Sequence, residues 1–334
     1  DVEAIPESMD RQKVFRTLHA AGEDRRVVAI VLRLREAPGG WATVQDLGTV
    51  IRSIRESGTP VYAFLEQGGN ALAWLAAQCD RAVMVPTGEM NVLGLGTEMT
   101  FYGAALERVG VQPDFEAAGE FKSFGEPFLR AFPSKANRLA TQALLDSMHS
   151  QMVEGIAVGR GCTTDVVQNV MDNGPLFAEQ AKEHGLIDDL KYEDEFQDWL
   201  EEQHGDRARS VPFGRWAFVW RLHQRLNRIG TKGKVVAVVH LEGPIVLEPG
   251  SSSPCIQGRK VAKMLRDLRE SEQVSAVVLN VNSPGGSALA SDLMWREVEQ
   301  MSQKKPVVAV FDDVAASGGY YLAAPAAEII ARQG

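Results

Sequence analysis

Short runs of β-branched and aliphatic residues alternate along the chain with longer stretches in which apolar residues recur every three or four positions. The first pattern is typical of buried parallel strands and the second of amphipathic helices. The pair occurs as VVAIVLRL at 27–34 followed by QDLGTVIRSIRES, and again as VSAVVLNV at 274–281 followed by SDLMWREVEQMSQ. Strands that alternate with helices predict an α/β fold with largely parallel sheets.

The two occurrences are also similar to each other in sequence. Residues 27–40 resemble 274–286, with one residue more in the earlier copy, and 59–84 align without gaps on 305–330. Each copy predicts a strand, a Pro-Gly-Gly turn, a helix, a second strand, a turn of small residues, a helix and a third strand. We therefore interpret the chain as an internal duplication.

The segment between the copies predicts the domain organisation. We expect a first domain at 1–203, a linker at 204–233 and a second domain at 234–334. The linker sequence predicts a basic amphipathic helix with two opposite faces. The apolar face consists of Trp216, Val219, Trp220, Leu222, Leu226 and Ile229, and the basic face of Arg221, Arg225 and Arg228. Two interpretations stay open: the tryptophans pack on a neighbouring domain, or the helix lies on an anionic membrane surface.

Composition excludes several classes of protein. The 334 residues include 31 Gly and 15 Pro, and no run of 18 uncharged apolar residues, which argues against collagen-like, disordered and membrane-spanning chains. A net charge of −9 argues against nucleic-acid binding by phosphate neutralisation. Cys79, Cys162 and Cys255 are too few and too far apart for a disulfide framework or a zinc site with paired thiolates, and they leave the redox compartment open.

Ser317 is the candidate nucleophile, in the sequence AASGGY at 315–320. A serine on a sharp turn that opens a helix presents its hydroxyl to a substrate, while backbone N–H groups at the helix N-terminus face developing negative charge. The aligned residue of the first copy is Ala71, so only the second copy carries a hydroxyl there. The alternative is that Ser317 is a small residue at a tight contact between helix and strand.

A second glycine-rich turn, NSPGGS at 282–287, follows the strand VVLNV. Gly285 and Gly286 have no Cβ atoms to obstruct the approach of a ligand to their N–H groups. Such a turn suits an oxyanion hole, the set of donors that stabilises a tetrahedral intermediate.

A reactive serine needs a base, and the histidines are poorly placed to supply it. His184 is predicted to end a helix, and His240, at the end of a strand, is interpreted as structural. Lys122, in FKSFGEPF at 121–128, is the other candidate. Desolvation by the three phenylalanines would favour its neutral form, which can act as general base to a serine; an exposed lysine without such a role is the alternative.

The motifs together resemble those of the signal peptide peptidase A (protease IV) family, in its long bacterial form of two tandem repeats. That family has Lys-Ser-x-x-Glu-Pro-Phe in the first repeat and Ala-Ser-Gly-Gly-Tyr in the second, matched here by Lys122–Phe128 and Ala316–Tyr320. The resemblance implies a Ser/Lys dyad of Ser317 and Lys122, with an oxyanion hole at Gly285, Gly286 and the amide of Gly318. It also implies tandem Clp-protease/crotonase-like repeats built of strand-strand-helix units.

The function implied by the resemblance is a serine endopeptidase without metal or organic cofactor. It would hydrolyse cleaved signal peptides and other extended hydrophobic peptides at the membrane. The family further implies a homotetramer, held in the bacterial inner membrane by an N-terminal anchor outside this chain, with the catalytic part facing the periplasm.

The resemblance further implies a chain cut at both ends, without the first strand of the first repeat. About half of the second repeat would also be missing, including a Thr-Gly-Ser-like motif that helps to hold the lysine. We therefore expect residues 234–334 to be less stable than 1–200 and to expose apolar surface.

Two other functions stay open at this point. A crotonase-like acyl-CoA hydratase or isomerase would use paired backbone amides in the same fold, but no carboxylate stands near the glycines to act as its acid or base. A non-catalytic assembly scaffold would lose nothing when Ser317 is replaced by alanine.

Overall fold

The computed structural model describes residues 11–205, 209–227, 233–248 and 255–332. Contacts divide the chain into two compact units. Unit 1 consists of Asp1–Pro38, Asp46–Gly214 and Gly334, and unit 2 of Gly39–Gln45 and Arg215–Gln333. The two units are described separately below.

The main sheet of unit 1 is parallel and has the strand order β1-β2-β4-β7. Helices connect the first three strands, in the order β1 (Ile30–Leu34), α2 (Trp41–Glu56), β2 (Val61–Leu65), α3 (Asn70–Ala77) and β4 (Arg81–Met84). The fourth strand, β7 (Asp189–Leu190), comes much later in the chain. All five residues of β1 are buried, as expected for a parallel strand covered on both faces. Helix α1 (Arg11–Gly22) precedes the sheet.

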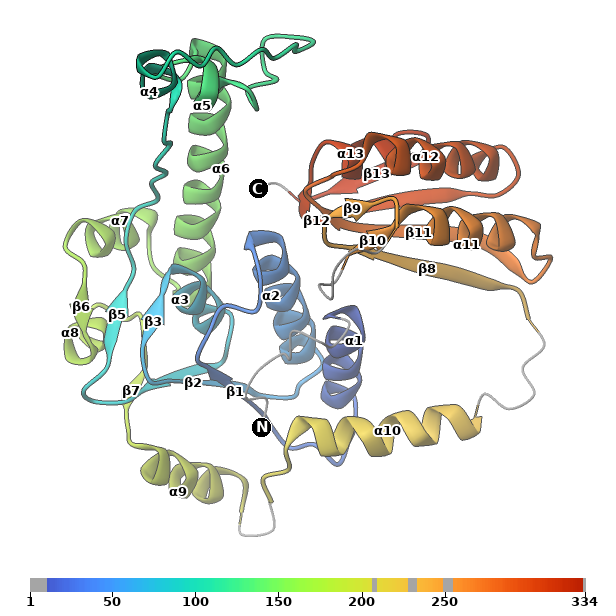
Figure 1. Ribbon diagram of the computed structural model, residues 1–334. Coiled ribbons are helices and arrows are strands. Elements are labelled where there is room, and N and C mark those ends of the chain that lie inside the picture. The colour runs from blue at the N-terminus through green and yellow to red at the C-terminus, as the bar shows by residue number, and fades with distance from the viewer. Residues whose placement is uncertain (1–10, 206–208, 228–232, 249–254, 333–334) are drawn as a thin grey trace. The chain divides into compact units, whose positions relative to one another are not determined.

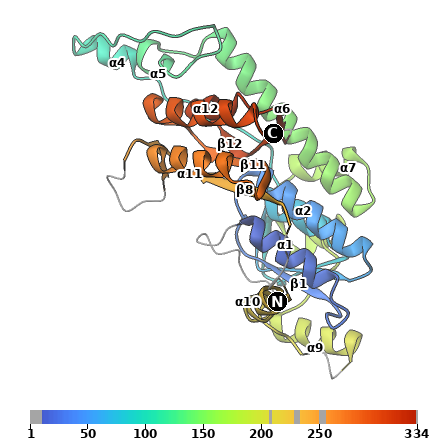
Figure 2. The ribbon, with the colours of Figure 1, turned by 90° about the vertical axis from the view of Figure 1, so that its right-hand side faces the viewer.

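The long segment between β4 and β7 forms several helices and two strands of a second, smaller sheet, whose third strand, β3, follows β2. The strands are β3 (Gly68–Gly69), β5 (Glu89–Asn91) and β6 (Leu176–Phe177), in the order β3-β5-β6. The helices are α4 (Gly103–Arg108), α5 (Glu126–Leu129), α6 (Lys135–Arg160), α7 (Thr164–Asp172) and α8 (Ala178–Glu183). Within this unit, α4 and α5 lie at the N-terminal end of the long helix α6, remote from the sheet (Figures 1 and 2).

Helix α9 (Glu193–His204) packs on the main sheet of unit 1. Phe196 is fully buried against Val31, Phe64 and Val83, one residue from each of three adjacent strands. Its ring stacks on Phe64 with the centroids 5.1 Å apart. Burial of one such side chain contributes about 1.5–3 kcal/mol to stability, so an acidic helix is held on the sheet by its few apolar residues.

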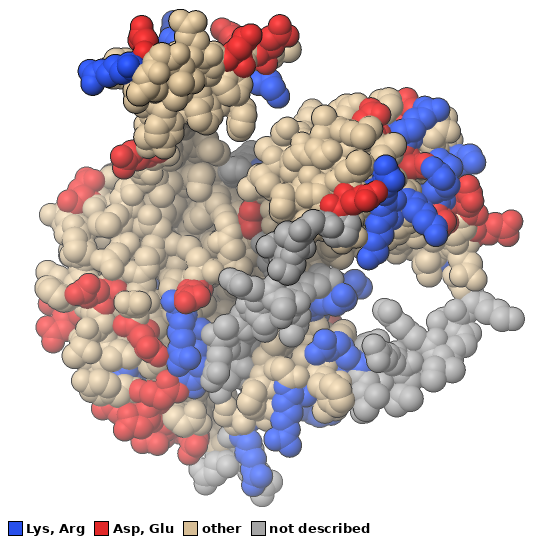
Figure 3. Space-filling view, in the orientation of Figure 1, with Lys and Arg blue, Asp and Glu red and all other residues tan. Residues whose placement is uncertain are grey.

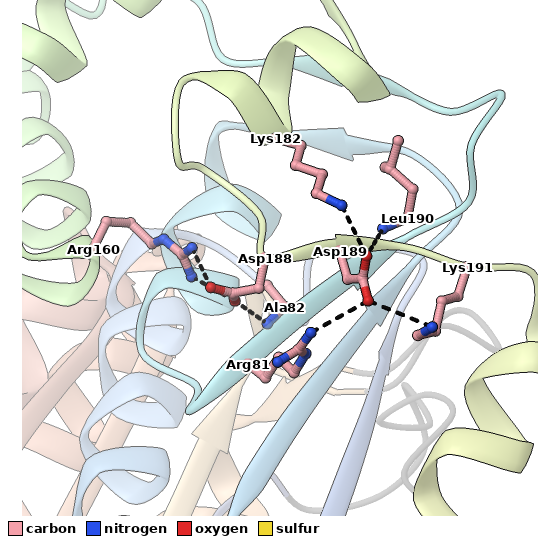
Figure 4. A network of polar contacts seen from close by, with 8 residues as sticks. All are labelled: Arg81, Ala82, Arg160, Lys182, Asp188, Asp189, Leu190 and Lys191. Atoms are coloured by element: carbon pink, nitrogen blue, oxygen red, sulfur yellow. Dashed lines mark hydrogen bonds and ion pairs between the residues drawn. The ribbon is translucent and has the colours of Figure 1, made fainter.

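Two neighbouring aspartates connect β7 to the rest of unit 1 (Figure 4). Asp188 receives two hydrogen bonds from Arg160, at 2.7 and 2.9 Å, and one from the Ala82 amide at 2.7 Å. Asp189 pairs with Lys182 at 2.9 Å, Arg81 at 3.2 Å and Lys191 at 3.5 Å. These bonds join α6, α8 and the short strand β7 to β4.

The sheet of unit 2 is also parallel, with the order β13-β12-β11-β8. Its elements are β8 (Val235–Glu242), β9 (Ile245–Val246), β10 (Ile256–Gln257), α11 (Gly258–Glu270), β11 (Val274–Ser283), α12 (Ala288–Ser302), β12 (Val307–Ala315), α13 (Gly318–Ala323) and β13 (Glu328–Ala331). Alternate residues of β8, β11 and β12 pack with the three helices in one core. On the other face of β8, Val236 and Val238 are 57% and 41% exposed.

Strand pairing is similar in the two units. Ile30 pairs with Val61 in unit 1 and Val277 with Val307 in unit 2, which are the pairs that the sequence alignment of the copies makes equivalent. The third strand differs by one residue, because Tyr62 pairs with Arg81 whereas Val308 pairs with Glu328. The predicted α/β fold with parallel sheets is confirmed, and the origin of the two units by duplication stays a prediction.

Helix α10 (Phe213–Asn227) falls in the predicted linker, and the division between the units comes at Gly214. Trp216 and Trp220 are partly buried and stack with their centroids 6.1 Å apart, as expected for residues on one helix face. The side chains of Leu222, Arg225 and Leu226, and the whole of Arg228 and Ile229, lie outside the described residues.

Candidate active site

Ser317 lies between the end of β12 and the start of α13, and its side chain is at the surface. Its backbone angles are φ 51° and ψ −116°, and it is the one non-glycine residue with positive φ in the described part of the chain. Such a conformation costs an L-residue roughly 1–3 kcal/mol and is concentrated at functional sites. The turn therefore holds the hydroxyl of Ser317 outward at the expense of backbone strain.

The two glycines after Ser317 are required by close packing. A Cβ atom on Gly318 would lie 2.3 Å from the Ser291 hydroxyl oxygen, and one on Gly319 would lie 2.8 Å from the Ser283 carbonyl oxygen. Both glycines are buried directly after the exposed serine. The small residues of AASGGY thus let α13 begin in contact with the ends of β11 and α12.

The second glycine-rich turn touches the turn of Ser317. Gly285 has a φ of 92°, and a Cβ atom on it would lie 2.7 Å from the Gly318 nitrogen and 2.8 Å from Ser317 Cβ. Gly286 has a φ of 150°, and a Cβ atom there would lie 2.2 Å from the Ile245 carbonyl oxygen. The structure therefore brings Gly285 next to Ser317 and Gly318, although Gly285 precedes Ser317 by 32 residues in the sequence.

The hydrogen bonds of these turns distinguish engaged N–H groups from available ones. The Gly285 N–H donates to Ser283 Oγ at 3.1 Å, and the Gly285 carbonyl accepts from the Ile245 N–H at 2.8 Å. Ser287 N–H donates to the Ile245 carbonyl at 2.9 Å. Over the described residues, no acceptor is bonded to the N–H of Gly286 or of Gly318. The N–H groups of Gly286 and Gly318 are thus unengaged within these residues, whereas Gly285 contributes the close approach of the two turns.

The corresponding turn of unit 1 has neither the hydroxyl nor the strain. Ala71 is the second residue of α3, and Gly69 before the helix has extended angles of φ −114° and ψ −172°. Only the second copy therefore has a hydroxyl on a strained turn, and its reactivity stays a prediction.

Lys122 lies in unit 1, in the turn between α4 and α5, and is exposed. Phe121 and Phe124 beside it are 56% and 77% exposed. At this end of unit 1, tan residues occupy the middle of the visible surface, with Lys, Arg, Asp and Glu side chains around them (Figure 3). Ser317 belongs to unit 2, and the pairing of Lys122 with it stays a prediction.

Aromatic contacts order the segment that carries Lys122. The Phe115 ring stacks on Phe128 with the centroids 5.6 Å apart and meets Phe124 edge-on at 6.3 Å. Tyr102, just before α4, also stacks on Phe128, with the centroids 6.1 Å apart, and its N–H donates to the Pro127 carbonyl at 2.6 Å. These contacts fold the loop between α4 and α5 back on itself.

Glu126 fixes the same segment to α6. Its Oε2 accepts from the Ser134 N–H at 2.9 Å and from Asn137 Nδ2 at 3.0 Å. Ser134 is the N-cap of α6, where its own hydroxyl accepts from the Asn137 N–H at 3.0 Å. Hydrogen bonds from the side chain and backbone of Ser134, with a smaller one from Asn137, lower the pKa of Glu126.

Histidines hold structural positions in this arrangement. His184 is the C-cap residue of α8, as predicted, and His240 Nδ1 on β8 lies 3.4 Å from Asn280 Oδ1 on the adjacent strand. Within the ranges that the structure describes, no group of three or more His, Cys, Asp or Glu is arranged to hold a metal ion. Cys79 is buried, and all three cysteines are free thiols.

Sequence reasoning missed Ser283, the last residue of β11. It is fully buried, and its hydroxyl donates to the Gly243 carbonyl at 2.8 Å while accepting from Gly285. The signal was its position directly before Pro284 and the glycines of the second turn.

The sequence is similar to those of several known proteases. The chloroplastic serine protease SPPA of Arabidopsis thaliana is 31% identical over 322 residues, covering 93% of this chain and 46% of that protein. Protease 4 of Haemophilus influenzae is 28% identical over 346 residues, covering 98% of this chain and 55% of that protein. Protease 4 of Salmonella typhi is 27% identical over 334 residues, covering 95% and 52%. The chain thus spans about half the length of these relatives.

No helix among the described residues is long and apolar enough to cross a membrane. The profile of Peptidase family S49 matches residues 53–206 and 299–334, segments that contain both Lys122 and Ser317. With a match over more than half of its length, the chain belongs to peptidase family S49.

Proposed function

We propose that this protein is a serine endopeptidase that uses Ser317 as nucleophile and Lys122 as general base. The observation that carries the proposal is the strained, exposed turn of Ser317 in contact with the Gly285–Gly286 turn. Membership of a peptidase family and the relatives named as serine protease and Protease 4 support this chemistry over a crotonase-like acyl-CoA reaction. The two-repeat architecture would result from duplication, as the equivalent strand pairings suggest.

In the proposed reaction, Ser317 Oγ attacks the carbonyl carbon of a peptide bond as neutral Lys122 accepts the hydroxyl proton. The N–H groups of Gly286 and Gly318 stabilise the oxyanion. When the intermediate collapses, the C–N bond breaks and the Lys122 ammonium returns the proton to the leaving amine. A water molecule, deprotonated by Lys122, then hydrolyses the acyl-enzyme. No metal or organic cofactor enters this scheme.

Extended hydrophobic peptides, such as signal peptides cleaved from secreted proteins, are the substrates that we propose. Apolar side chains close in sequence to Ser317 are exposed and available to a peptide: Val314 is 43% and Tyr320 54% exposed, and Tyr320 packs on Phe311 with the centroids 5.8 Å apart. By family resemblance, the complete protein would be held at a bacterial inner membrane by an N-terminal anchor and would face the periplasm.

Assembly would provide the environment that Lys122 needs. A lysine is neutral near pH 7 only when water is largely excluded from it, and Lys122 is exposed in a single chain. The segment from α4 to the start of α6, which carries Lys122, exposes large apolar side chains: Val109, Phe124 and Phe132 are 72%, 77% and 72% exposed. We propose that a second copy of the protein covers this patch in a homo-oligomer, a tetramer by resemblance.

The test is hydrolysis of a fluorogenic hydrophobic peptide by the complete protein and four variants. Ser317→Ala and Lys122→Ala should each lower kcat by at least about a thousandfold, the loss expected when a nucleophile or its base is removed. Ser302→Ala and Lys135→Ala are the matched controls and should retain activity. Full activity in either of the first two variants removes that residue from the mechanism, and full activity in both favours a non-catalytic scaffold.

A further inference from the structure

The end of β11 meets three other segments of unit 2 at a single residue, Ser283. Its hydroxyl donates to the Gly243 carbonyl, in the turn after β8, at 2.8 Å. The same hydroxyl oxygen accepts from the Gly285 N–H at 3.1 Å. Its backbone carbonyl accepts from the Ala316 N–H, directly before Ser317, at 2.9 Å.

The chemistry of this position requires a serine. A hydroxyl is one donor and also an acceptor, and Ser283 uses both capacities at once. The side chain is fully buried, so it has no access to a substrate and is not itself a nucleophile. Gly319 packs closely on Ser283, since a Cβ atom on Gly319 would lie 2.8 Å from the Ser283 carbonyl oxygen and 3.2 Å from Ser283 Cβ.

The hydrogen bonds of Ser283 engage the Gly285 N–H and leave that of Gly286 unengaged within the described residues. By engaging the Gly285 N–H, Ser283 fixes the orientation of the peptide between Pro284 and Gly285. The Gly285 carbonyl is held in turn by the Ile245 N–H at 2.8 Å. With both sides of Gly285 fixed, the next N–H, that of Gly286, has its direction determined and no acceptor within the described chain.

We propose that Ser283 is a positioning residue that sets the oxyanion hole and the nucleophile turn in register with each other. It acts through two connections: its hydroxyl orients the Gly285–Gly286 turn, and its carbonyl holds Ala316 next to Ser317. This inference rests on the proposed peptidase function. It adds a residue that never contacts the substrate.

The experiment compares Ser283→Ala with Ser302→Ala in the complete protein. Ser302 is a matched control because its hydroxyl also lies within hydrogen-bond distance of two backbone groups of unit 2, the Val298 carbonyl at 2.9 Å and the Pro325 carbonyl at 2.7 Å, and both are outside the two turns. In Ser283→Ala we expect kcat to fall about 10- to 100-fold, since misplacement of catalytic groups by about 1 Å costs up to this factor. KM should stay within about twofold.

A second measurement separates positioning from a general loss of structure. A peptide aldehyde forms a tetrahedral adduct with the serine hydroxyl and needs the oxyanion hole, whereas an uncleaved peptide bound to a Ser317→Ala background does not. Affinity for the aldehyde should fall in parallel with kcat/KM in Ser283→Ala, and affinity for the uncleaved peptide should not change. Equal losses in both affinities would overturn the proposal, as would a kcat equal to that of Ser302→Ala.

Ser283→Cys keeps the test informative if the alanine variant does not fold. A thiol is a weak donor and acceptor, so the cysteine variant should retain intermediate kcat with unchanged KM; wild-type kcat in a folded Ser283→Cys would contradict the proposal. If Ser317→Ala leaves hydrolysis intact, the peptidase function fails and this inference with it. If Ser317→Ala abolishes hydrolysis while Ser283→Ala does not lower it, the inference alone is wrong.

Discussion

At the scale of single residues, the site is built on a conflict between side chain and backbone at Ser317. Its φ of 51° and ψ of −116° belong to a region that glycine adopts without penalty. Glycine in this position would relieve the strain, but it would also remove the hydroxyl. Gly318 and Gly319, which follow it, have no space for a Cβ atom. The proposed role as nucleophile requires a hydroxyl at position 317, whereas local stability favours glycine there.

This conflict makes a prediction about two inactive variants. Ser317→Gly should be more stable than Ser317→Ala by about 1 kcal/mol, because relief of backbone strain worth roughly 1–3 kcal/mol exceeds the extra entropy that glycine gives the unfolded chain, roughly 0.4–1 kcal/mol. Urea unfolding of the two variants measures the difference. Equal stabilities, or a more stable alanine variant, would show that the turn is not strained in solution.

At the scale of elements, short polar connections hold segments that have little apolar surface to bury. The four-residue helix α5 has no buried residue, and Glu126 ties it to the N-terminus of α6. The two-residue strand β7 is likewise connected to α6 and α8 through Asp188 and Asp189. In both places a carboxylate accepts several hydrogen bonds, which favours its ionised form.

Removal of the Glu126 carboxylate should loosen the segment that carries Lys122. In Glu126→Ala, limited proteolysis at neutral pH should cleave residues 110–133 faster than in the wild type, with the remainder of unit 1 unaffected. Glu116→Ala is the control, since Glu116 is an exposed residue of the same loop and makes no hydrogen bond or ion pair within the described ranges. Equal cleavage of the two variants would mean that the aromatic contacts of Phe115 and Phe128 hold the segment without Glu126.

The pKa of Asp189 makes a prediction about acid. Burial opposes its ionisation, but hydrogen bonds from Lys182 and the Leu190 N–H, with the charges of Lys182 and Lys191, lower its pKa from 3.8 to about 2. A pKa lower in the folded state than in the unfolded state stabilises the fold above about pH 4, and this contribution is lost as the pH falls toward 2.

The stability difference between wild type and Asp189→Asn should thus be largest at pH 7 and shrink between pH 4 and about pH 2. Urea unfolding at several pH values measures it. Asp114→Asn, which changes an exposed aspartate for which the described part of the chain shows no hydrogen bond or ion pair, should not show this trend. A constant difference across this range would contradict the assignment.

At the scale of the whole molecule, the two units divide the proposed machinery. Lys122 belongs to unit 1, while Ser317, Gly286 and Gly318 belong to unit 2. The units also differ in how their sheets are covered. Helix α9 buries Phe196 on the sheet of unit 1, whereas Val236 and Val238 on β8 of unit 2 are exposed. Parallel sheets are ordinarily covered on both faces.

This difference predicts the order in which the units unfold. Unit 2 of the 334-residue chain should open first, because the exposed side of its sheet gains no stabilisation from apolar burial. Hydrogen exchange followed by mass spectrometry should find faster exchange in β8 and β11 than in β1 and β2. Slower exchange in β8 and β11 would mean that the core shared by α11, α12 and α13 compensates for the exposed face.

Sequence by itself determined the alternation of strands and helices, the positions of the two glycine-rich turns and the identity of the candidate reactive residues. Local patterns suffice for these, since apolar periodicity and residues with unusual backbone freedom are legible along the chain. It also indicated that Ala71 leaves the first copy without a hydroxyl at the turn.

Tertiary structure decided which groups at those turns are available. Three contacts show this: Ser283 accepts from the Gly285 N–H, Gly285 packs against Gly318, and Glu126 bonds to the N-terminus of α6. Each depends on the direction of a side chain or on the close approach of two backbone segments. Such contacts depend on how strand ends and helix ends converge in space. A pattern of apolar and polar positions gives the face on which a side chain lies, but not the donor or acceptor that it meets there.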